Sequence, residues 1–143
     1  MPRKAKAPPP AAVPVADARI ARQCGWSPDG LIGPNGAIEV KCPRPANHWS
    51  AWQDATGKTG LAAVPSHHRA QLLHAFVVGH EALAWIDWVS YCPLFPVGLQ
   101  LLVIRVERHG CEAEIERYRG ALSQFLEELE AEYEAMRQRC PTF

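Results

Sequence analysis

Three charged residues that could act together lie in the segment SPDGLIGPNGAIEVKCP, residues 27–43. Asp29 precedes a turn, and Glu39 and Lys41 flank one apolar residue. Carboxylates that converge on one point resist joint ionisation unless a cation neutralises them. Hard oxygen ligands suit Mg²⁺ or Mn²⁺, which leave room for water and phosphate oxygens. A neighbouring lysine can orient the attacking water and offset charge on the phosphate. These residue types therefore suit metal-assisted hydrolysis of a phosphodiester.

Two short strands joined by a tight turn must position these side chains. Residues 31–33 predict one strand, and the alternation over 37–41 predicts the next, with Glu39 and Lys41 on one face. A hairpin between the two strands would bring Asp29 beside that face. A bare Glu-x-Lys pair is more commonly a solvated strand face, and this alternative predicts that both side chains are exposed. The opposite face would carry Ile38, Val40 and Cys42.

The rest of the chain alternates between strand and helix patterns, which favours an α/β or α+β sheet covered by helices. The near-continuous apolar run of residues 98–108 predicts a strand buried on both faces. The last helix has an apolar stripe wider than a coiled-coil seam, so we expect it to pack on the sheet of its own domain rather than to form such a seam. The expected elements are a strand at 18–26, a short helix at 47–55, a loop at 56–65, a helix at 66–78 with Ser66 as N-cap and Gly79 ending it, strands at 81–92 and 98–108, and a long helix at 111–140.

Composition limits the class of protein. The chain has 143 residues, which suits one domain, and no apolar stretch is long enough to cross a membrane. Five cysteines without a Cys-x-x-Cys pair indicate free thiols in a reducing compartment, hence the cytoplasm. The formal net charge is zero, so charge alone neither demands nor excludes nucleic acid. Residues 1–16 are rich in Pro and Ala, and we expect them to be a disordered basic tail.

Some polar and aromatic residues near these elements suit nucleic-acid contacts. Arg44 and Lys58 are placed to touch phosphates, although solvated loop charges are the more common case. Trp49 and Trp52 could stack on bases, although most tryptophans belong to the core. Histidines at three nearby positions lack a cysteine or carboxylate at matching spacing, so surface or partly buried histidines are favoured over a zinc site. They are His67, His68 and His74.

The longer pattern resembles a known family. SPDG, a ten-residue interval and then EVKCP closely resemble the signature of the lambda exonuclease-like, or YqaJ-type, viral recombinases. That family belongs to the PD-(D/E)xK nuclease superfamily. The resemblance continues through AVPSHHRAQLLHAF, AWIDWVSYCP, LLVIRVER and a closing acidic helix, and covers residues 24–136. It implies a restriction-endonuclease-like α/β fold, in which a mixed sheet is flanked by helices.

The resemblance also implies roles for individual residues. Asp29 and Glu39 would bind the metal, with the backbone carbonyl of Val40 as a further ligand. Lys41 would position or activate the nucleophilic water, and Gln71 would orient water or lysine from its helix. The implied protein is a Mg²⁺-dependent DNA exonuclease that degrades double-stranded ends from 5′ to 3′, with Mn²⁺ as a substitute. A single-strand annealing recombinase as partner, a ring-shaped homotrimer and a phage or prophage source follow from the same resemblance.

The sequence departs from the family in two respects. Family members carry a helical section before SPDG, which supplies another acid and an arginine that grips the 5′-phosphate. Here that place holds residues 1–16, so we expect 17–143 to be a nuclease core without this section. His68 stands where a tyrosine is common. One alternative is a truncated, non-catalytic remnant that binds DNA or a protein. Another is an interaction protein that associates through its last helix.

Overall fold

A mixed sheet of four strands, in the order β1-β2-β3-β4, forms the centre of the computed structural model. The structure describes residues 18–79 and 82–140, so the tail expected at 1–16 lies outside the described residues. β1 pairs with β2 antiparallel, β2 with β3 parallel, and β3 with β4 antiparallel. The expected mixed α/β sheet is therefore confirmed. The strands are β1 (Gly30–Ile32), β2 (Gly36–Lys41), β3 (Trp85–Tyr91) and β4 (Leu101–Glu107).

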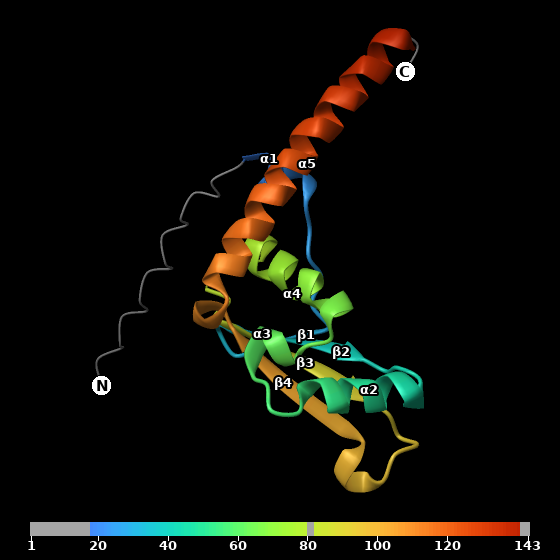
Figure 1. The fold of residues 1–143 in the computed structure, drawn as a ribbon. Coiled ribbons are helices and arrows are strands. Elements are labelled where there is room, and N and C mark those ends of the chain that lie inside the picture. The colour runs from blue at the N-terminus through green and yellow to red at the C-terminus, as the bar shows by residue number, and fades with distance from the viewer. Residues whose placement is uncertain (1–17, 80–81, 141–143) are drawn as a thin grey trace, which may run out of the picture.

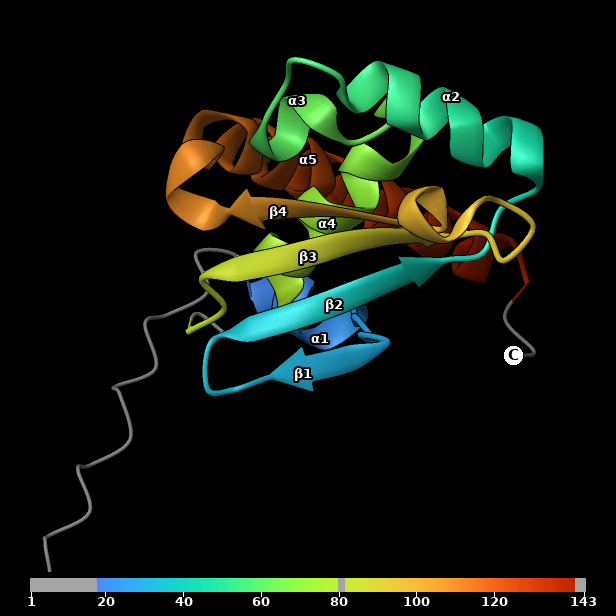
Figure 2. The same ribbon diagram turned by 90° about the horizontal axis from the view of Figure 1, so that it is seen from below.

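Helices cover one face of this sheet. Figure 2, seen from below, shows the strands in front of α1 and α4, with α2 and α3 along the β4 side. The segment from α2 to α4 is the crossover that a parallel β2–β3 pair requires. Short 3₁₀ turns, Val97–Leu99 and Arg108–Gly110, flank β4. The helices are α1 (Ala18–Gln23), α2 (Pro45–Ala55), α3 (Gly60–Ala63), α4 (Ser66–Val78) and α5 (Glu112–Arg139).

The core lies between α4 and the inner face of β3 and β4. Ile86 and Trp88 on β3 are buried, as are Leu72 and Phe76 on α4. Full burial of a large apolar side chain contributes about 1.5–3 kcal/mol, so this contact holds α4 in place. Every residue that α4 directs at β2 is positioned by that packing.

The prediction that residues 98–108 are buried on both faces is wrong. Along β4, Leu102, Ile104 and Val106 are buried, whereas the residues between them are exposed. β4 is the last strand of the sheet, and the described helices cover only one of its faces. A continuous apolar run therefore does not require that both faces of the strand be buried, and in β4 only one face is covered.

Three local predictions need correction. The segment expected as a strand at 18–26 begins with the helix α1, because Ile20 buries itself near α5. The expected loop at 56–65 contains α3, whose Ala63 is buried. Ser66 is the first residue of α4 and Pro65 is its N-cap, although Gly79 does follow the end of the helix as predicted.

The last helix is present but does not pack on the sheet as expected. Its first half lies against α4, α1 contacts it as far along as Glu130, and the last turns extend beyond both helices (Figure 1). Ile115 and Leu126 are buried there. The apolar stripe thus reaches well past the part of the domain that it packs on.

Two expectations from composition are met. All five cysteines are free thiols. Among residues 18–79 and 82–140, every helix is too short or too polar to cross a bilayer.

Candidate functional site

The β1–β2 hairpin brings Asp29 to the end of β2. Gly30 pairs with Ile38 in antiparallel register, so continuing that register places Asp29 opposite Glu39 and next to Val40. The backbone N–H of Val40 donates a hydrogen bond of 2.7 Å to Oδ2 of Asp29. The side chain of Asp29, just before β1 begins, therefore serves as the acceptor for this N–H in place of a backbone carbonyl, and its position is tied to β2.

Glu39 is the centre of a cluster of polar side chains on the inner face of β2. Its relative exposure is 5%, although it is a carboxylate. Lys41 Nζ and Gln71 Nε2 each donate to Oε1 of Glu39 at 2.5 Å. A buried carboxylate is tolerated only with a charge partner and hydrogen bonds, and Glu39 has both.

The shared face of Glu39 and Lys41 is confirmed, and the solvated alternative is not. The face that carries them is the one under the helices, whereas Val40 on the opposite face is exposed. The more polar side of β2 therefore faces inward. A buried ion pair here is no more stabilising than well-packed apolar side chains would be, so stability alone does not explain why it is present.

Gln71 belongs to the same cluster although it is far away in the sequence. It lies on α4, and its amide reaches Glu39 across the space between the helix and the sheet. Gln71 is exposed as a residue, but its side-chain amide is bound to Glu39. Segments around residues 29, 39–41 and 71 converge at the carboxyl end of β2.

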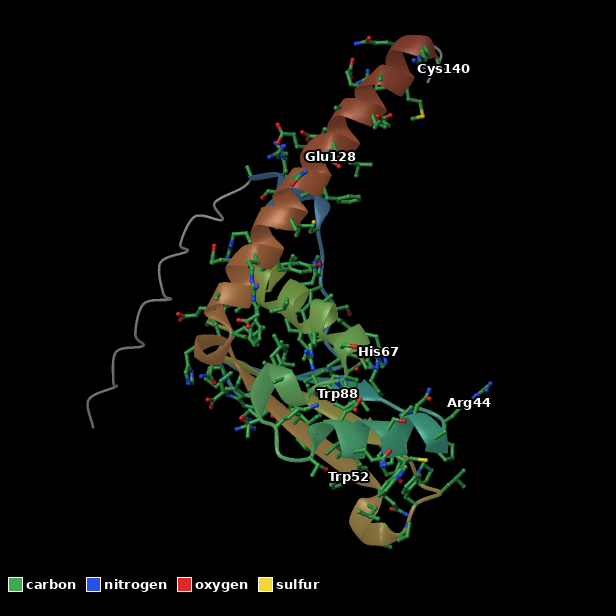
Figure 3. The ribbon with its side chains drawn as sticks, viewed as in Figure 1. Arg44, Trp52, His67, Trp88, Glu128 and Cys140 are labelled. Atoms are coloured by element: carbon green, nitrogen blue, oxygen red, sulfur yellow. The ribbon has the colours of Figure 1, made fainter. Side chains whose placement is uncertain are left out.

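A small cavity of about 170 Å³ adjoins this cluster. Lys41, His68, Trp88 and Asp54 are among the residues that line it, while the two carboxylates of the hairpin are not. The indole N–H of Trp88 is buried and has no hydrogen-bond partner among the described residues. Figure 3 shows Trp88 and His67 close to one another below α4. The wall of the cavity thus includes a cation, Lys41, and a tryptophan, Trp88, whose indole N–H lacks a described partner.

His68 takes part in this wall. Its ring lies 5.4 Å from that of Trp88 and 4.1 Å from that of His67. Burial lowers the pKa of His68, and the charges of His67 and Lys41 lower it further, while Glu39 raises it. A neutral imidazole is therefore favoured in this position.

Asp54 was missed in the sequence. It lines the cavity together with Ala51, Ser50 and Asn47, which precede it by three, four and seven residues and so lie on one face of α2. That spacing of one alanine and three polar residues was the available signal. It is weak, because polar faces of helices are usually solvated.

The residues expected to contact nucleic acid are dispersed. Arg44 is exposed at the start of α2, near the end of β2 (Figure 3). Trp49 is also exposed and stacks on Phe95 at 6.4 Å. Trp52 instead packs against the core, and its indole N–H donates to the carbonyl of Leu99 at 3.1 Å. Lys58 lies in a different hollow, over β4, so the structure does not bring it to the carboxylates.

The histidines do not form a metal site. His74 bonds Tyr118 at 3.1 Å and the carbonyl of Gly25 at 3.1 Å. Within the described part of the chain, no three His, Cys, Asp or Glu side chains are grouped closely enough to hold an ion. A metal at the hairpin would therefore depend on two carboxylates with backbone and solvent oxygens.

Comparison with known proteins identifies the fold. No protein-family model matches the sequence, and a search among curated proteins finds no match. Among solved structures, the alkaline exonuclease LHK-Exo from Laribacter hongkongensis is similar, with 34% identity and a TM-score of 0.61. That match covers 80% of this chain and 54% of LHK-Exo. LHK-Exo in complex with dAMP matches with 35% identity and a TM-score of 0.60, over 80% of this chain and 53% of that one.

The chain thus spans about half the length of the solved relatives that it matches. Over that half, the mixed sheet flanked by helices agrees with a restriction-endonuclease-like fold of the PD-(D/E)xK type. Both the sequence signature and the fold of these solved relatives support one assignment, the lambda exonuclease-like nuclease family.

Proposed function

We propose that this chain carries the catalytic centre of a metal-dependent deoxyribonuclease. The observation that supports it most is the convergence of Asp29, Glu39, Lys41 and Gln71 at the end of β2. Two carboxylates, a cation and an amide in one place suit phosphodiester hydrolysis better than they suit folding. The solved relatives named above are exonucleases, which supports the same reaction class.

The residues present fit a divalent metal with hard oxygen ligands. We propose Asp29, Glu39 and the backbone carbonyl of Val40 as its ligands. Mg²⁺ is commonly bound through one or two carboxylates with water completing the shell, which agrees with a site of two carboxylates; Mn²⁺ would be accepted as well. Both described hydrogen bonds of Glu39 use Oε1, so a cation would bind through Oε2. When bound, such a metal supplies Lewis-acid polarisation of the phosphoryl oxygen and a more acidic water.

Lys41 and Gln71 would orient the attacking water. An ammonium has three donors and no acceptor, so Lys41 holds water and offsets charge rather than removing a proton. Water would attack phosphorus as the bond from phosphorus to the leaving oxygen breaks, and the proton that the water loses would pass through solvent to the leaving oxygen. The amide of Gln71 fixes Glu39 now and has a carbonyl oxygen left to accept a hydrogen bond from the same water.

The cavity beside the cluster would hold a phosphate oxygen. Lys41 offers its charge there, and the unpartnered indole N–H of Trp88 offers a donor. Arg44 and Trp49 lie exposed beyond it, where they would contact the phosphate backbone and a base of the same strand. Trp52 is less suited to that role because its indole is engaged in packing.

The finer features of the proposal rest on the family resemblance. They are a preference for double-stranded ends, 5′ to 3′ polarity and work beside a single-strand annealing protein in phage-type recombination. The place of action would be the cytoplasm of a bacterial host. Each of these is a property of a whole enzyme. This chain spans about half the length of the solved relatives.

The test is digestion of linear, 5′-phosphorylated duplex DNA by the purified chain with Mg²⁺, Mn²⁺ or EDTA. We expect metal-dependent release of nucleotides that Asp29→Asn and Lys41→Ala each reduce at least about 100-fold, as removal of a group that stabilises transition-state charge does. Glu116→Gln, on the exposed surface of α5, is the matched control and should retain full activity. Circular dichroism of every variant must show the native fold. A folded chain that releases nothing with either metal would contradict the proposal and favour a non-catalytic DNA-binding module.

A further inference from the structure

Most of the buried polar side chains among residues 18–79 and 82–140 lie around the carboxyl ends of β2 and β3. Glu39, His48 and Ser90 have relative exposures of 5%, 0% and 0%. Asp87, on the opposite face of the sheet, is bound by Arg105. The site on β2 uses Glu39, whereas His48 and Ser90 are buried beside it without a role in the proposed chemistry.

Ser90 is the neighbour of Lys41 in the sheet. The two residues are partners in the parallel register of β2 and β3, and both line the cavity of about 170 Å³. On the same face of β3, Ile86 and Trp88 belong to the apolar core. A hydroxyl therefore stands on this face at the position that adjoins the lysine.

His48 fixes the direction of the Ser90 hydroxyl. Nε2 of His48 lies 2.8 Å from the carbonyl oxygen of Leu99, which can only accept, so we assign the ring proton to this nitrogen. In the neutral ring Nδ1 is then an acceptor, and the hydroxyl of Ser90 donates to it at 2.7 Å. The proton of Ser90 is thus committed to His48, and only lone pairs of its oxygen remain for Lys41.

Those lone pairs suit an ammonium. The ammonium of Lys41 has three donors, and Glu39 accepts from it at 2.5 Å. A hydroxyl that donates a hydrogen bond is also a better acceptor, because hydrogen bonds in a chain polarise one another. His48 therefore makes Ser90 a stronger acceptor beside a lysine that has further donors to place.

We propose that Ser90, oriented by His48, keeps the ammonium of Lys41 at the site when a divalent cation is bound there. The inference rests on the proposed function. A cation on Glu39 would share the charge that holds Lys41 and would repel the ammonium. The side chain of Lys41 is long, flexible and 25% exposed, so without a second acceptor it would turn toward water. Ser90 and His48 are positioning residues, because both act through Lys41.

The lysine side chains provide the readout, through NMR of the whole chain with ¹³C-labelled lysine. The chain has only four lysines, and Lys41→Met assigns the signal of Lys41. In the wild type, Mg²⁺ should shift this signal, and relaxation of its Cε should show an ordered side chain both in EDTA and in saturating Mg²⁺. Ser90→Ala should leave Lys41 ordered in EDTA, where Glu39 holds it, and make it mobile in Mg²⁺.

Variants of His48 separate the direction of the hydroxyl from its presence. His48→Leu removes the acceptor and frees the proton of Ser90 to turn toward Lys41, so Lys41 should be mobile in Mg²⁺. His48→Asn offers an amide oxygen near the place of Nδ1 and should restore the order. Ser50→Ala is the matched control, because it removes a hydroxyl from the α2 wall of the same cavity and should leave the Lys41 signal unchanged. Circular dichroism must show the native fold in each variant.

The outcomes separate this inference from the proposed function. Lys41 that stays ordered in Mg²⁺ in both Ser90→Ala and His48→Leu, or that becomes mobile in the wild type, would overturn the inference and leave the metal site standing. Lysine signals that ignore Mg²⁺ altogether would refute the metal site, and the inference with it.

The nuclease assay gives a second readout. Ser90→Ala should lower kcat by roughly tenfold or more and change KM for DNA by less than about twofold, because a lysine that is misplaced affects the reaction rather than binding. A Ser90→Ala variant with the kcat of the wild type would contradict the inference.

Discussion

Loss of the ammonium of Lys41 should destabilise the fold more than loss of both charges of its ion pair. The side chain of Glu39 is 6% exposed and that of Lys41 is 25% exposed. Removal of one partner from a buried pair costs about 3–5 kcal/mol, because the other charge stays buried without compensation. Here Gln71 still donates to Glu39 and the site is not fully closed, so we expect Lys41→Met to cost about 2–3 kcal/mol.

The other corners of the cycle should differ. In Glu39→Gln, the ammonium of Lys41 can turn toward water, so the change should be about 1 kcal/mol or less. In the double variant no charge remains buried, and stability should lie within about 1 kcal/mol of the wild type. The effects are therefore expected to be non-additive by at least about 1 kcal/mol.

Urea unfolding in EDTA, followed by fluorescence of the five tryptophans, measures this cycle. Unchanged m-values would show that the variants differ in stability and not in compactness. Saturating Mg²⁺ should then stabilise the wild type and Lys41→Met but not Glu39→Gln, because only the first two keep the proposed ligand. The reasoning is refuted if Lys41→Met is as stable as the wild type or if the two substitutions are additive.

Three further predictions concern the rest of the fold. Burial is the main cause that lowers the pKa of His68 below 6.5, so the unfolded chain binds the extra proton more readily than the folded chain. The free energy of unfolding should therefore be retained above pH 6.5 and decrease below it. Urea titrations at two pH values should show a weaker decrease for His68→Phe. Burial raises the pKa of Cys111 to about 11, so iodoacetamide at pH 8 should label the exposed Cys140 and spare Cys111 until the chain unfolds, as peptide mass spectrometry would report. A methyl group at Gly36 would collide with the ring of Trp85, so Gly36→Ala should cost about 1–3 kcal/mol in thermal unfolding, whereas Gly120→Ala, in open space on α5, should add up to about 1 kcal/mol.

The sequence was sufficient for the elements around the site. Alternation over residues 37–41 predicted that Glu39 and Lys41 share a face, because the strand period of two is a local property. The turn at 34–36 predicted the hairpin, which then places Asp29 without further information. The position of Gln71 came from the family resemblance and not from the pattern of α4, whose periodicity does not say which residues face β2.

Features that depend on distant neighbours were predicted poorly. Whether β4 is covered on one face or two depends on elements elsewhere in the chain, so an apolar run could not decide it. The prediction that α5 packs on the sheet was wrong for the same reason. The apolar stripe of a helix does not show which part of the domain lies beneath it, or where that part ends. The helix α1 is six residues long, and such a segment is stabilised by its contact with α5 rather than by its own propensity.

Asp29, one of the proposed ligands, also accepts a hydrogen bond from the backbone N–H of Val40, so it satisfies a donor that the sheet would otherwise leave unpaired. Asparagine at position 29 keeps an acceptor for that N–H while losing the negative charge, so the hairpin should survive a substitution that removes metal affinity. Alanine at the same position would remove both and leave a strand end unsatisfied. The register of β1 on β2 therefore also sets the spacing of the two carboxylates, and a slip of one residue would separate them while leaving every side chain intact.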